Sequence, residues 1–152
     1  MSTRNRLLVG FSAVSVAAAL LLPAVPQPLD YHHFADRRDL YGVENFLDVF
    51  SNAGFLLVGL IGLAVVVRAD TVFERPAERV PSVVFFLGMV LTALGSACSP
   101  LSPDNERLFW DRLPMTIAFM SLVSAQLVDR VAPRVGLALL LPLLLLGVAS
   151  VV

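Results

Sequence analysis

Two polar residues stand at the facing ends of neighbouring apolar stretches. Ser96 lies at the end of one stretch and Asp111 at the start of the next, so a helical hairpin would bring them together. Polar side chains at membrane depth are costly and are therefore functional candidates. A structural interpretation competes, because Asp111 followed by Pro114 resembles a helix N-cap that accepts backbone N–H groups. On these residues alone we favour the structural interpretation.

Three further residues near the same end of the apolar stretches can also be interpreted as either functional or structural. Trp110 has the position of a residue in an interfacial aromatic belt. Ser51 and Asn52 open another apolar stretch, where small polar residues can pack helices together or shape a binding site. We favour packing for this pair.

The candidate metal ligands are few. His32 and His33 are adjacent, and adjacent residues of a regular element rarely point into one site. We favour a solvated interfacial pair, with a loose loop site that also uses Asp30 and Asp36 as the alternative. Cys98 is the only cysteine, which excludes an internal disulfide and any cysteine-rich metal cluster.

The composition indicates lipid as the solvent of this chain. Apolar residues make up 57% of its 152 residues, against roughly 45–50% in a soluble domain. The net charge of −1 gives no electrostatic case for a nucleic-acid partner. The sequence contains no lysine and is rich in alanine, valine, leucine and arginine, which suggests a GC-rich bacterial genome. We therefore expect the protein to lie in the bacterial inner membrane.

Five apolar stretches approach the about 20 residues that a membrane-crossing helix needs. The predicted fold is therefore an all-α, polytopic membrane bundle of about five transmembrane helices, in a single domain over residues 1–152. The first stretch follows two arginines and resembles a signal peptide, but the proline-rich sequence after it favours a retained anchor. Residues 68–80 alternate acids and arginines, which is typical of a solvated connector. The predicted helices span residues 7–25, 46–67, 81–98, 113–128 and 135–152.

The arginines also predict an orientation. Seven of the eleven lie on the side that holds the N-terminus and residues 68–80, and four lie on the other side. Positive residues favour the cytoplasm, so we expect a cytoplasmic N-terminus. The polar candidates, among them Ser96 and Asp111, then lie on the outer side.

Three segments, residues 34–38, 45–52 and 95–116, resemble a known family. The most specific elements are Ser51-Asn52 and the run Trp-Asp-Arg-Leu-Pro-Met-Thr over residues 110–116. They are similar to the bacterial branch of the alkaline ceramidase (phytoceramidase) family, in the membrane hydrolase superfamily that includes the adiponectin-receptor-like proteins. The resemblance extends from about residue 5 to the end of the chain.

The resemblance implies a seven-helix bundle in which three histidines bind a catalytic zinc and zinc-bound water attacks the amide of a ceramide-like lipid. Ser96 and Asp111 would be the catalytic serine and aspartate. Ser51, Asn52, Trp110 and Arg112 would support the substrate or the structure. The first zinc-binding histidine is expected at position 100, which is Pro100, and the other two on a seventh helix, whereas this sequence ends in its fifth.

All three expected zinc ligands are therefore missing, and we expect a truncated or degenerate copy of the family. Cys98, His32 and His33 are the substitute ligands that the outer side offers. The family's calcium site would draw on the oxygen donors of Asp36, Glu44 and Asp48.

Three functions follow as expectations. The first is an inactive ceramidase-like membrane protein. The second is a metal-dependent amide hydrolase of sphingolipid-type substrates whose metal ligands differ from those of the family. The third is a non-enzymatic lipid-binding or interaction protein. Ceramide and lipid metabolism is the expected context. Membrane lipids are the expected partners, and a five-helix remnant of a seven-helix fold would expose surfaces that favour a homo-oligomer.

Overall fold

The computed structural model describes residues 38–68, 73–98 and 105–151, together with Val14, Ala17 and Leu21; the side chains of residues 105–107 are not included. The chain divides into two units, Met1–Tyr31 and His32–Val152, and every element below belongs to the second. The elements are α2 (Phe46–Ser51), α3 (Ala53–Arg68), the 3₁₀ helix η2 (Pro76–Arg79), α4 (Val80–Cys98), α5 (Asn105–Arg130) and α6 (Pro133–Ala149).

The described part of the chain is helical and contains no β-strand, which confirms the predicted all-α class for these residues. A single pair of backbone hydrogen bonds joins Leu40 and Val43 across a tight turn. Tyr41 and Gly42 occupy that turn with φ of 58° and 77°. This positive-φ geometry at both central positions is that of a type I′ turn, in which glycine carries no steric cost.

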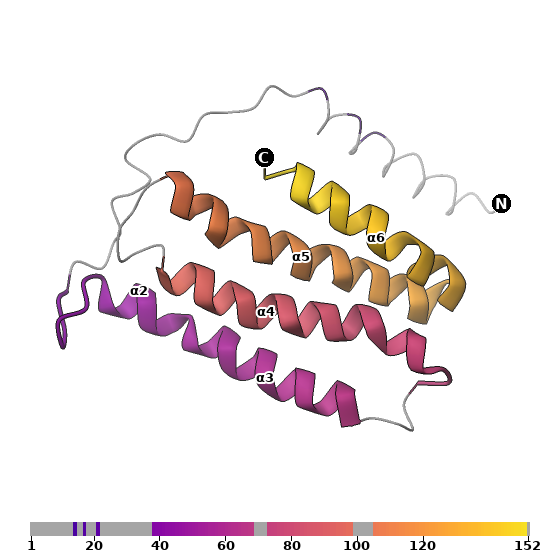
Figure 1. The fold of residues 1–152 in the computed structure, drawn as a ribbon, viewed down its shortest axis with the longest axis horizontal. Coiled ribbons are helices and arrows are strands. Elements are labelled where there is room, and N and C mark those ends of the chain that lie inside the picture. The colour runs from indigo at the N-terminus through magenta and orange to yellow at the C-terminus, as the bar shows by residue number, and fades with distance from the viewer. Residues whose placement is uncertain are drawn as a thin grey trace. The chain divides into compact units, whose positions relative to one another are not determined.

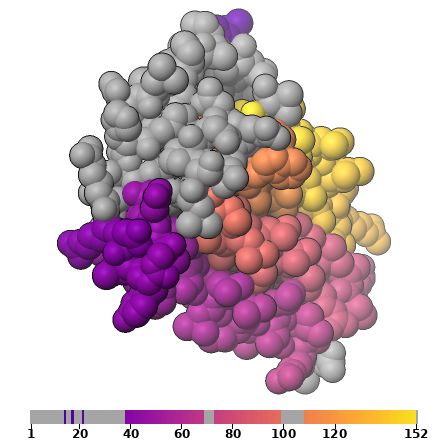
Figure 2. Space-filling model, turned by 60° about the vertical axis from the view of Figure 1, so that its left-hand side comes forward, coloured from indigo at the N-terminus to yellow at the C-terminus, as the bar shows by residue number. Residues whose placement is uncertain are grey.

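The four long helices lie side by side in chain order, so that α4 packs between α3 and α5, and α6 packs on α5 (Figure 1). The neighbours are antiparallel, since Gly88 faces Ala118 on α5 while Gly95, later in α4, faces the earlier Trp110. Figure 2 shows the side chains of α3 lying against those of α4.

Small residues set the closeness of these contacts. A Cβ added to Gly88 would lie 2.9 Å from the backbone nitrogen of Ala118, and one added to Gly136 of α6 would lie 2.5 Å from the backbone nitrogen of Val128. Ser124 is fully buried at the second contact and donates a 2.9 Å hydrogen bond to the carbonyl of Gly136. Small residues at helix contacts let the backbones approach closely.

The observed bounds can be set beside the predicted ones. The expected helix over residues 7–25 lies outside the described residues, apart from the helical Val14, Ala17 and Leu21. The stretch expected over 46–67 is interrupted at Asn52, between α2 and α3, and α4 and α6 begin within two residues of their predicted starts. The expected start of the fourth segment at 113 is wrong, because α5 already begins at Asn105.

Two helical stretches are long and apolar enough to cross a membrane. They are Phe46–Arg68 and Pro76–Cys98, each 23 residues long, while the apolar helix Pro133–Ala149 is shorter. At 1.5 Å per residue, 23 helical residues extend about 35 Å, which exceeds a hydrocarbon core of about 30 Å.

Candidate functional site

The structure brings Ser96 and Asp111 into contact. The hydroxyl of Ser96, in the last turn of α4, donates a hydrogen bond to Oδ1 of Asp111 on α5, and both side chains are half-buried. The two residues are fifteen positions apart in sequence and come from neighbouring antiparallel helices.

Gly95 is the residue that lets the two helices come this close. A Cβ at Gly95 would lie 2.6 Å from the carbonyl oxygen of Trp110 and 3.4 Å from the Cα of Asp111. The first distance is shorter than real Cβ atoms adopt, so α4 can lie directly on the backbone of α5 only without a side chain at this position. The contact of Ser96 with Asp111 is thus positioned by the adjacent glycine.

Asp111 is not a helix N-cap, and the structural interpretation drawn from the sequence is wrong on this point. It lies inside α5, six residues after Asn105, and the helix continues through Pro114. An interior proline removes one backbone hydrogen bond, here the one that would end on the Trp110 carbonyl. Neighbouring helices and hydroxyl side chains make such prolines tolerable in apolar surroundings. Thr116 donates to the carbonyl of Leu113 at 2.9 Å in this turn.

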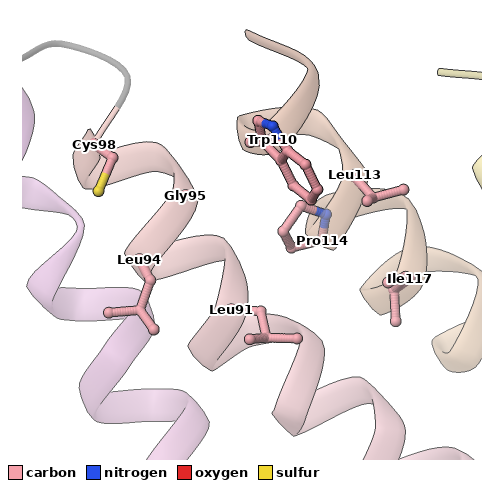
Figure 3. A pocket seen from close by; sticks show the side chains of 8 residues that line it. All are labelled: Leu91, Leu94, Gly95, Cys98, Trp110, Leu113, Pro114 and Ile117. Carbon is pink, nitrogen blue, oxygen red and sulfur yellow. The ribbon is translucent and has the colours of Figure 1, made fainter. Parts of the chain in front are cut away.

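An apolar groove of about 570 Å³ runs between α4 and α5 beside this pair (Figure 3). Cys98 and Trp110 lie at one end and Leu91 and Ile117 at the other, with Gly95 in between. The groove therefore follows about two helical turns, roughly 10 Å. Neither Ser96 nor Asp111 lines it, but each is directly next in sequence to a residue that does.

Ser51 and Asn52 hold the break between α2 and α3. The Ser51 hydroxyl and the Asn52 amide both donate to the carbonyl oxygen of Asp48, at 2.9 and 2.8 Å. Ser51 is exposed, whereas Asn52 lines a small apolar cavity of about 240 Å³ between α2 and α4. Both hydrogen bonds are local to α2, and neither residue lines the groove beside Trp110.

The remaining predicted site residues fall into two groups, one beside the groove and one near the start of α2. Trp110 is 57% exposed, Cys98 is exposed, and Arg112 is half-buried and has an interaction partner. Glu44 is exposed, and Oδ2 of Asp48 is buried without a hydrogen-bond partner in the described part of the chain. The predicted ligands His32, His33 and Asp36 lie outside the described residues.

The described residues do not supply the zinc site that the resemblance implies. Among the residues that the structure describes, no three of the types His, Cys, Asp and Glu lie close enough together to hold a metal ion. Position 100, which lies outside those residues, is a proline in the sequence, and proline has no side-chain donor atom.

Glu78 is an acidic residue whose burial the sequence did not predict. Residues 68–80 were expected to be a solvated connector, but Glu78 in η2 is buried, with 8% of its surface exposed. The expectation is wrong at this residue because η2 packs against α4, α5 and α6. Alternating charges along the sequence do not indicate which member faces neighbouring helices.

No family model, curated protein or solved structure matches this chain.

Proposed function

We propose that this chain is a ceramidase-like integral membrane protein that binds a sphingolipid-type amide at Ser96 and Asp111. The observation that carries the proposal is the hydrogen bond between these two side chains, which come from separate helices. They are also the two residues of the family's catalytic set that match this sequence.

The chemistry of the pair suits such a lipid. A carboxylate accepts several hydrogen bonds, and a serine hydroxyl that donates to it retains acceptor lone pairs. A ceramide-like lipid presents an amide N–H and hydroxyl donors next to two hydrocarbon chains. The pair can accept from those donors, while the groove beside Gly95 and Trp110, with a volume of about 570 Å³, has an apolar lining suited to a hydrocarbon chain.

The exposure of the helices supports the membrane placement. In the most apolar windows of Phe46–Arg68 and Pro76–Cys98, only 17% and 28% of the residues are buried. The core helix of a soluble protein would be largely buried, since exposed apolar surface in water is costly. On α3, large apolar side chains such as Phe55, Leu57 and Ile61 are about half exposed or more. Lipid is the solvent that accommodates such a surface. A bacterial inner membrane and a cytoplasmic N-terminus are part of the proposal.

A binding titration tests the proposal. The purified 152-residue chain in detergent micelles is titrated with a fluorescent ceramide, and with a diacylglycerol of equal chain length that lacks the amide. We expect preferential binding of the ceramide and a loss of about tenfold in affinity for Asp111→Asn, because a charge-assisted hydrogen bond contributes roughly 1.5–3 kcal/mol. Asp39→Asn, which changes an exposed acid elsewhere, should bind as the wild type does. Equal affinity for the two lipids would refute the proposed specificity.

Hydrolysis of the bound amide is the second candidate, favoured by the same contact because a carboxylate beside a hydroxyl can orient a water molecule and accept its proton. Ceramide hydrolysis and the zinc content of the purified protein are measured together, with Asp111→Asn as the comparison. Ceramide turnover that Asp111→Asn abolishes would establish an enzyme. Binding that survives chelation without turnover would establish a lipid-binding protein.

A further inference from the structure

An aromatic cluster of Tyr41, Phe46 and Phe50 lies on the surface where the chain enters α2. Tyr41, in the tight turn between Leu40 and Val43, is 95% exposed, and Phe50 is 64% exposed. The ring of Phe46 joins them, because its centroid lies 6.0 Å from that of Tyr41 and 5.6 Å from that of Phe50. Aromatic rings carry a large apolar surface, and a group of such rings facing water is unfavourable. The aromatic cluster is therefore a candidate contact surface.

The backbone at Tyr41 is strained. Its φ of 58° lies in the left-handed region, which costs a residue other than glycine roughly 1–2 kcal/mol. A type I′ turn favours asparagine or aspartate before the glycine, because their short polar side chains tolerate this geometry. Here a tyrosine precedes Gly42. The turn itself gives no reason for a tyrosine at this position, so we look for the reason in what its ring contacts.

The length of the adjoining helical stretch puts the aromatic cluster at a membrane boundary. Phe46–Arg68 is long and apolar enough to cross a membrane, and Arg68 lies in its last turn. A hydrocarbon core of about 30 Å takes up about 20 helical residues. Counted back from Arg68, about 20 residues end near Asp48, which lies between the two phenylalanines of the cluster. The turn that holds Tyr41 then lies just outside the hydrocarbon, at the level of the lipid headgroups.

An exposed tryptophan on another helix marks the same level independently. Trp110, in the second turn of α5, is 57% exposed. Leu94 of α4 lines both the cavity that Phe50 borders and the groove that Trp110 borders, so the two rings flank α4 at one level of the bundle. Figure 1 shows α2 and the start of α5 at the same end of the helices. Tryptophan and tyrosine are enriched at membrane–water interfaces, where their amphipathic rings lie among the headgroups.

We propose that the aromatic cluster inserts into the interfacial layer of a zwitterionic membrane, at the level of Trp110. The inference rests on the membrane placement in the proposed function, and it does not depend on the contact between Ser96 and Asp111. Tyr41 suits this layer because its ring can lie against the upper part of the lipid chains while its hydroxyl bonds to headgroups or water.

The charges near the aromatic cluster favour zwitterionic over anionic lipid. Residues 38–50 contain one arginine against three acidic residues, a formal net charge of −2: Arg38, Asp39, Glu44 and Asp48. Anionic lipids attract basic segments that lie near the membrane surface. An acidic segment gains no such attraction, so the insertion of the cluster depends on its rings and not on lipid charge.

The experiment measures the depth of a single tryptophan in the full chain, reconstituted in phosphatidylcholine vesicles. Tyr41→Trp is made in a Trp110→Phe background, and its exposed position leaves no buried gap. Val58→Trp in the same background is the matched control, because Val58 is 53% exposed and lies midway between Asp48 and Arg68. Tyr41→Trp should lose more fluorescence to lipids brominated near the headgroup than to lipids brominated near the chain end. We expect the reverse for Val58→Trp.

The two variants separate failure of this proposal from failure of the membrane placement. If Val58→Trp is quenched from the chain ends while Tyr41→Trp responds only to aqueous acrylamide, the helices cross the membrane but the aromatic cluster contacts water or another protein, and the proposal is overturned. If brominated lipid quenches neither variant, the membrane placement fails as well. Adding phosphatidylglycerol should leave the quenching of Tyr41→Trp by headgroup bromines unchanged or weaker, and stronger quenching would overturn the preference for zwitterionic lipid.

Discussion

Replacing Gly95 by alanine tests whether α4 and α5 meet as closely as the structure shows. The added Cβ would lie 2.6 Å from the carbonyl oxygen of Trp110, whereas ordinary contact begins near 3.4 Å, about 0.8 Å further. The atom in the way belongs to the backbone of α5 and cannot rotate aside as a flexible side chain could. The helices must therefore separate by several tenths of an ångström.

Two opposing contributions set the expected change in the free energy of unfolding for Gly95→Ala. Alanine gains up to about 1 kcal/mol over glycine in a helix interior, whereas overpacking a close contact costs about 1–3 kcal/mol. Gly54, in the first turn of α3, is the matched control, because a Cβ there meets nothing within 4 Å. We expect Gly95→Ala to be less stable than Gly54→Ala by about 1–3 kcal/mol. The separation should also weaken the hydrogen bond from Ser96 to Asp111 and, with it, the proposed binding of ceramide.

The assay is reversible unfolding of each variant in mixed micelles with increasing dodecyl sulfate. Trp110 is the only tryptophan and lies at the contact itself, so its fluorescence reports on this contact. Far-ultraviolet circular dichroism measures the loss of helix independently. If Gly95→Ala is as stable as Gly54→Ala by both probes and binds ceramide normally, the close approach at Gly95 does not position the site.

Three further predictions concern the helix contacts and the membrane. Ser124→Ala should lower the free energy of unfolding by about 0.5–1.5 kcal/mol, because it removes the buried hydrogen bond to Gly136, and the same unfolding titration measures this loss. Thr92→Val should change it by less than about 1 kcal/mol, since the hydrogen bond of the Thr92 hydroxyl is to the Gly88 carbonyl of its own helix and joins no two helices; an effect as large as that of Ser124→Ala would contradict this distinction. In vesicles, Trp110 fluorescence should be quenched more by lipids brominated near the headgroup than by those brominated near the chain end, and quenching by aqueous acrylamide alone would argue against an interfacial position.

The sequence by itself determined the helical class of the described residues and the positions of most helix ends. Long apolar runs separated by arginines and prolines leave few alternatives to helices, and charges mark where such runs stop. The chain order of Ser96 and Asp111, at the facing ends of two such runs, also made their contact predictable. Their role in binding or catalysis remains a prediction.

The tertiary structure decided where α5 begins and which side chains are covered by neighbouring helices, which the pattern of apolar residues does not show. α5 begins at Asn105, eight residues before the apolar run that starts at position 113, because its first turns contain polar residues that the length of an apolar run does not register. Asp111 therefore proved to be an interior residue that faces α4. Glu78 was missed for the related reason that burial depends on which neighbouring helix covers a side chain, and the local sequence does not contain that information. Gly95 is ordinary in sequence, and only the position of the Trp110 carbonyl shows why a side chain does not fit there.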